Sequence, residues 1–115
     1  MGRLVSQGAE AFRRQLESLR AEYRAGLPAT LATIESLWRG LEGGAADPAR
    51  MRELLRALHS VAGSARTFGV AGVSEAAAAA ESCLEPHSAA GSISGPAERA
   101  RFARKLDALK RAVTP

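Results

Sequence analysis

Apolar residues along the chain recur at steps of three and four, the spacing that places them on one face of an α-helix. The clearest case is a single stripe near the middle of the chain: Met51, Leu54, Leu58, Val61, Ala65 and Phe68. The sequence contains no alternation of apolar and polar residues typical of a strand, and no Asn-Gly or Asp-Gly hairpin turn. The pattern therefore predicts an all-α protein.

Glycine, proline and serine divide this pattern into five helical segments. Pro28, Pro48 and Pro96 each suit the first position of a helix, where the missing N–H has no partner to lose. Gly26 and Gly69 suit the ends of helices. The predicted helices cover about residues 7–26, 28–42, 48–68, 71–85 and 96–113. Because the last four are similar in length and mostly joined by short connections, we expect an antiparallel four-helix bundle with an additional N-terminal helix.

Composition limits the class of protein. The chain has 115 residues, a common size for a single domain, and 46% of them are hydrophobic, which excludes a disordered tail. No stretch approaches the ~20 apolar residues needed to cross a bilayer. The single cysteine, Cys83, cannot form an intrachain disulfide, and no set of metal-ligating cysteines exists. We therefore expect a cytoplasmic protein with no metal site and no membrane contact.

The charge balance is moderately basic, with sixteen Lys and Arg against twelve Asp and Glu. A basic chain can bind nucleic acid or phosphorylated partners. The basic residues near the C-terminus, however, alternate with Phe102, Leu106 and Leu109 at helical spacing. This arrangement favours a solvated face of an amphipathic helix, so we expect no nucleic-acid binding. A small nucleic-acid-binding bundle stays the third alternative.

The predicted helix 48–68 carries a distinct set of residues opposite its apolar stripe: Arg52, Arg56, His59, Gly63 and Arg66. Nearby cations disfavour a charged ring, so we expect His59 to present a neutral, nucleophilic imidazole. Glycine inside a helix costs ~1 kcal/mol relative to alanine. Gly63 therefore indicates a close approach to the helix surface, with neutral drift or close helix packing as the alternatives. The arrangement is suited to a histidine that carries a phosphoryl group, with arginines that stabilise the anion.

The stretch from Leu58 to Glu81, LHSVAGSARTFGVAGVSEAAAAAE, resembles the histidine-containing phosphotransfer (HPt) domains of bacterial phosphorelays. The family pattern is a histidine, two residues, usually a lysine, then a glycine and a small residue. His59, Gly63 and Ser64 match it, whereas Ala62 stands where the lysine is usual. Outside this stretch the resemblance rests on the bundle pattern.

The resemblance implies that His59 accepts a phosphoryl group, through Nε2, from an aspartate of one receiver domain and passes it to another. It implies that Gly63 gives access. Since Arg56 and Arg66 both lie within ~60° of His59 on the helical wheel, we hypothesise that they replace the missing lysine. The residues expected to dock the receiver are Arg52, Ser60, Ala62 and Ser64.

The implied partners are receiver domains of response regulators and hybrid histidine kinases, which would supply the Mg²⁺. No Walker-type phosphate loop is visible, so we expect a phosphotransfer protein without its own ATP site, cofactor or enzymatic turnover. Because the exposed faces carry many charges, we expect a stand-alone monomer. The missing lysine leaves one alternative open, a helical adaptor that binds response regulators or kinases without being phosphorylated.

Overall fold

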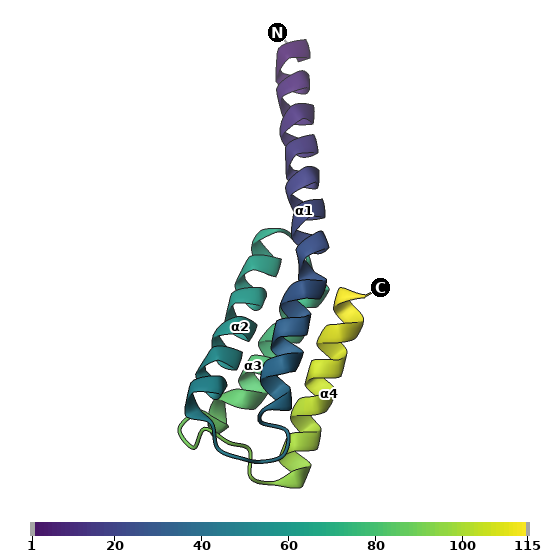
Figure 1. The fold of residues 1–115 in the computed structure, drawn as a ribbon. Helices are drawn as coiled ribbons and strands as arrows, with labels where there is room; N and C mark the ends of the chain where they lie inside the picture. The colour runs from purple at the N-terminus through teal and green to yellow at the C-terminus, as the bar shows by residue number, and fades with distance from the viewer. Residues whose placement is uncertain (1, 115) are drawn as a thin grey trace.

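The computed structural model describes the backbone of residues 2–114 and the side-chain surroundings of residues 6–114. Within this range all regular structure is helical, and Figure 1 shows the helices packed side by side as an antiparallel bundle. The elements are α1 (Gly2–Arg39), α2 (Pro48–Thr67), α3 (Ala71–Leu84), the 3₁₀ turn η1 (Glu85–His87) and α4 (Pro96–Val113). The predicted all-α bundle is confirmed, and the predicted bounds of the last three helices agree with the structure to within one residue.

The predicted break between residues 26 and 28 is wrong. Helices expected over 7–26 and 28–42 are a single helix, α1, with Pro28 in its interior. The expected additional N-terminal helix is the first part of α1, which rises alone above the bundle in Figure 1. Helix α1 also ends at Arg39, three residues earlier than predicted, in a turn that buries Leu41.

Packing explains why Pro28 does not end the helix. An interior proline removes one backbone hydrogen bond and costs ~3 kcal/mol. Leu27, Leu31 and Ile34 lie on both sides of the proline and are all buried in the core. Burying each such side chain contributes ~1.5–3 kcal/mol, and a continuous helix keeps all three on one face. The burial therefore outweighs the proline penalty, while Pro28 itself is exposed.

Aliphatic side chains form most of the core, as the low aromatic content predicts. The fully buried residues include Leu54, Leu58, Leu84 and Ile93, and the Trp38 and Phe102 rings meet with centroids 4.7 Å apart. Helices α2 and α3 are in close contact through small buried residues: Ala62, Ala65, Ser74, Ala77 and Ala80. The buried Ser74 hydroxyl donates a hydrogen bond to the Ala62 carbonyl at 2.7 Å, which ties the two helices together.

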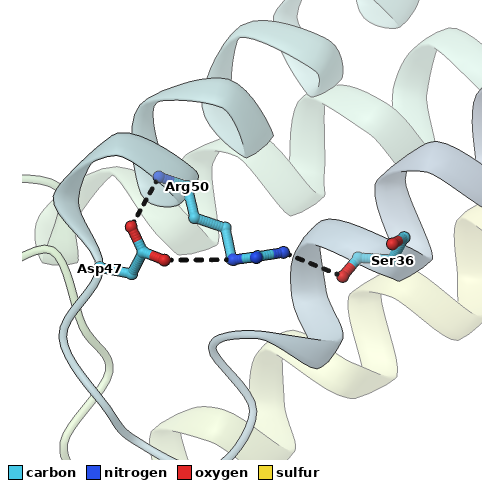
Figure 2. Close-up of polar contacts among 3 residues, drawn as sticks. All are labelled: Ser36, Asp47 and Arg50. Carbon is cyan, nitrogen blue, oxygen red and sulfur yellow. Dashed lines mark hydrogen bonds and ion pairs between the residues drawn. The ribbon is translucent and has the colours of Figure 1, made fainter.

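The start of α2 is held by a side-chain cap. The Arg50 backbone N–H donates to Asp47 Oδ1 at 3.1 Å, and Arg50 Nε donates to Oδ2 at 3.3 Å (Figure 2). The same guanidinium donates through Nη1 to the Ser36 carbonyl of α1 at 3.4 Å. The backbone hydrogen bond, aided by the guanidinium, lowers the pKa of Asp47. These contacts fix the first turn of α2 to α1.

The end of α2 is also fixed to α1. The chain turns at Gly69, whose φ of +73° lies in the left-handed region that favours glycine. Arg20 Nε donates to the Phe68 carbonyl at 2.7 Å, and the Tyr23 ring stacks on the Phe68 ring with centroids 4.9 Å apart. Helix α2 is thus held at both ends, which makes it a rigid support for the side chains on its outer face.

We refer to residues 2–19 of α1 as the arm. Every side chain from Ser6 to Leu19 is exposed, and the molecule measures 64 × 25 × 19 Å. Among the described helices, the arm included, none has an apolar stretch of the length needed to cross a membrane.

Candidate functional site

His59 lies in the middle of α2 and points to solvent, as predicted. Its side chain is 79% exposed. Leu58 and Val61, which are close to His59 in sequence but belong to the apolar stripe on the opposite face, are buried in the core. The helix is therefore anchored on one face and presents the imidazole on the other.

A carboxylate on the neighbouring helix orients the imidazole. His59 Nδ1 lies 2.8 Å from Oε2 of Glu81 on α3, and the Glu81 side chain is only 18% exposed. A carboxylate oxygen accepts hydrogen bonds, so Nδ1 is the donor. In the neutral ring this leaves the lone pair on Nε2, the nitrogen free to attack a substrate.

Sequence reasoning did not assign a role to Glu81. The residue is the last one of the stretch that resembles the family, so a signal was present. What was missing is the register between α2 and α3, which the Ser74–Ala62 hydrogen bond makes visible. Two turns beyond Ser74 on α3, Glu81 comes within reach of His59.

Gly63 leaves the helix surface open one turn after His59. Apart from the adjacent residues and the helix's own backbone, no atom lies within 4 Å of the position that a Cβ would occupy there. The structure therefore excludes close helix packing as the reason for this glycine. A reacting group approaching His59 meets no side chain at this point.

The predicted arginines Arg52, Arg56 and Arg66 are all exposed on α2. Within residues 6–114, no hydrogen bond or ion pair occupies any of their guanidinium groups. Arg66 lines an open depression of about 390 Å³ between α2 and α3, together with Gly69, Ser74 and Ala78.

Ala62 is not part of the exposed face, and its prediction as a docking residue is wrong. The residue is 8% exposed because the small residues of α3 allow that helix to approach closely, with Ser74 bonded to the Ala62 carbonyl. The position at which the family usually has a lysine is here covered by α3.

The two predicted docking serines differ in their surroundings. Ser60 is exposed, whereas Ser64 is half-buried. The Ser64 hydroxyl donates to the Ser60 carbonyl at 2.8 Å and therefore accepts from the Tyr23 hydroxyl, 2.7 Å away. Both serines line an open groove of about 320 Å³ between α1 and α2, together with Tyr23 and Thr30.

The remaining chemically active side chains lie elsewhere. Cys83 is half-buried in α3, and His87 lies in η1 with Nε2 3.9 Å from Glu98 Oε2. In the part of the chain that the structure describes, His, Cys, Asp and Glu do not form any group of three suited to a metal ion.

The exposed histidine, its carboxylate partner and the bare helix surface agree with a comparison to known families. The family model of the Hpt domain matches residues 10–112. The chain belongs to the Hpt domain family. Hpt domains are helical bundles that carry phosphoryl groups on histidine in two-component phosphorelays, so the resemblance seen in the sequence is confirmed and a phosphorelay role follows. No curated protein and no solved structure matches the chain.

Proposed function

We propose that this Hpt domain is a phosphorelay intermediate whose phosphoacceptor is His59. The observation that carries the proposal is the exposed imidazole held by Glu81 at 2.8 Å, beside the open surface at Gly63. One receiver domain supplies the phosphoryl group from an aspartyl phosphate, and the aspartate of another receiver takes it.

The transfer needs only one nucleophile from this chain. The Nε2 lone pair attacks phosphorus in line with the bond to the receiver aspartate, the N–P bond forms, and the aspartate leaves as a free carboxylate. The ring retains its Nδ1 proton and becomes positively charged. The Glu81 carboxylate offsets this charge, because its Oε2 already accepts the Nδ1 hydrogen bond. Transfer to the second receiver is the reverse of these steps.

Arg66 and Arg56 supply positive charge for the phosphoryl oxygens in the absence of the usual lysine. Both guanidinium groups are exposed and unoccupied by other side chains in the described structure. A guanidinium binds a phosphoryl group through two parallel hydrogen bonds, whereas an ammonium acts as a point charge. Arg56 lies about one turn before His59 on α2, and Arg66 lies about two turns after it.

The docking face surrounds His59 and extends onto α1. It comprises Arg52, Ser60 and the rim residue Ser64, with the groove between α1 and α2 beside them. Exposed arginines accelerate association with the acidic cleft of a receiver. We expect the receiver to supply the Mg²⁺ as well, since this chain contributes the nucleophile and the positive rim.

The test is transfer from a phosphorylated receiver to the purified protein. The wild type should gain a label that is labile in acid and stable in base, and His59→Gln should gain none. The buried Ala62 at the lysine position favours one other function, an adaptor that binds receivers without accepting phosphate. Receiver binding by the wild type without any label would support the adaptor and overturn the relay.

A further inference from the structure

The arm exposes an apolar stripe that no other part of the described structure covers. Within residues 6–114 the exposed large apolar side chains are Phe12, Leu16 and Leu19, at 64%, 38% and 42% exposure. All three belong to the arm and lie at helical steps of four and three. The sequence predicted a monomer because the exposed faces are well charged, and this stripe is the exception.

The stripe continues the core-facing side of α1 beyond the end of the bundle. Below the arm, the same side of α1 carries Leu27, Leu31 and Ile34, which α2 and α4 help to bury. Helix α2 ends at Thr67 and α4 at Val113, so the arm rises past both (Figure 1). The arm therefore lacks a neighbouring helix. Its 4–3 spacing is that of a seam between two helices.

The size of the molecule indicates how much surface a partner would cover. The accessible surface is 7184 Å², whereas a compact monomer of 12.0 kDa exposes about 6,000 Å². The radius of gyration is 17.6 Å, against about 13 Å for a compact chain of this length. The excess of about 1,200 Å² lies on all sides of the arm, whereas each partner contributes ~800 Å² to a stable interface. A stable pair therefore needs both the stripe of the arm and the end of the bundle against which the partner's arm lies.

We propose that the arm pairs with the arm of a second copy of this chain, antiparallel and around a two-fold axis. The orientation follows from the side that the stripe faces. Tyr23, the next residue of the stripe, stacks on Phe68 at the end of α2, so the stripe faces the space above the bundle. A parallel copy would place its own bundle in the space of the first. An antiparallel copy places only its arm there.

The register follows from matching the two stripes. With Leu16 opposite the other copy's Phe12, Ala9 lies opposite Leu19, and Gly2 at the tip of each arm reaches the level of the other copy's Gly26. An open depression of about 390 Å³ lies at that level, lined by Leu27, Val70, Val73, Ala112 and Val113 among others. Each copy therefore carries both the projecting arm and the depression that receives the other copy's arm, as a two-fold contact requires.

Helix dipoles favour the same arrangement. At the end of the bundle from which the arm rises, α2 and α4 present C-terminal ends with partial negative charge, and α3 presents one N-terminal end with partial positive charge, so the negative ends are in excess. An antiparallel partner brings the positive N-terminal end of its α1 to this place. His59 lies more than two turns before the end of α2, so both phosphoacceptor faces of the pair remain open.

Sedimentation equilibrium over a wide concentration range tests the pairing. The wild type should approach twice its 12.0 kDa mass as concentration rises. The double variant Leu16→Glu, Leu19→Glu should remain monomeric, while the control Ser18→Glu, Ala21→Glu, with equal added charge away from the stripe, should pair as the wild type does. Circular dichroism checks that both variants retain the bundle. A wild type that is monomeric up to about 1 mM, or a stripe variant that still dimerises, would overturn the proposal.

Disulfide trapping in a Cys83→Ser background tests the orientation. Antiparallel arms predict that Ala9→Cys protein links to Leu19→Cys protein when the two are mixed, and that Ala9→Cys protein does not link to itself. Efficient self-linking of Ala9→Cys indicates parallel arms and contradicts the proposed pair. Protection of the arm from amide exchange by a receiver, in a protein that stays monomeric, would assign the stripe to the receiver instead.

Discussion

Gly63 allows a prediction that separates the stability of α2 from access to His59. The Gly63→Ala substitution adds a methyl group where no atom lies within 4 Å, so it introduces no clash. Replacing an interior helical glycine by alanine is worth ~1 kcal/mol, which corresponds to a rise in Tm of roughly 4 °C for a domain of this size. Thermal unfolding followed by circular dichroism measures the shift. A fall in Tm would show that the site is packed, which contradicts the open surface described above.

A longer side chain at the same position separates access from stability. Gly63→Gln should leave the fold intact but place its amide beside the imidazole, and phosphotransfer from a receiver should slow by about tenfold or more, as misplacing reacting groups does. Gly72→Gln is the matched control, because Gly72 is also exposed with no atom within 4 Å but lies in the first turn of α3. Transfer to the Gly63→Gln variant at the wild-type rate would refute the role of Gly63 in access.

Substitutions at three further positions test the roles assigned to Glu81, Arg66 and Asp47. Glu81→Ala frees the His59 ring and should slow phosphotransfer by about tenfold, the value of one charge-assisted hydrogen bond, whereas Glu81→Gln should retain part of the rate in single-turnover assays. Arg66→Ala should slow transfer or shorten the lifetime of the phosphohistidine without lowering Tm, and Arg66→Lys should restore only part of the loss. Asp47→Ala should lower Tm at pH 7, and Asp47→Asn should lower it less because asparagine also caps helices. Since the pKa of Asp47 is lowered in the fold, its contribution is complete above the ordinary pKa of 3.8 and is lost as the pH falls through the lower folded value. Equal Tm values for wild type and Asp47→Ala at pH 7 would refute the cap.

Local signals predicted most of the fold. Pro48 marked the start of α2, and Gly69 marked its end, because each suits the backbone conformation required at that position. Pro28 failed as a signal for the opposite reason. Its effect is local, whereas the burial of the residues around it depends on helices far away in sequence.

In the candidate site too, some residues could be placed from local signals and others depend on helices far away in sequence. His59 and Gly63 could be placed on the outer face of α2 from the helical repeat alone. Glu81 and Ala62 could not, because both depend on how α3 packs against α2. The alanine-rich sequence of α3 brings that helix close, which covers Ala62 and places a carboxylate 2.8 Å from the imidazole.

The central claim is that His59 carries the phosphoryl group on Nε2 while Glu81 holds Nδ1. After transfer from a phosphorylated receiver, ¹⁵N and ³¹P NMR of the protein identify the modified nitrogen directly. The account predicts a single N–P coupling at Nε2 of His59, absent from His59→Gln. Phosphate found on Nδ1, on His87 or on an oxygen of another side chain would contradict it.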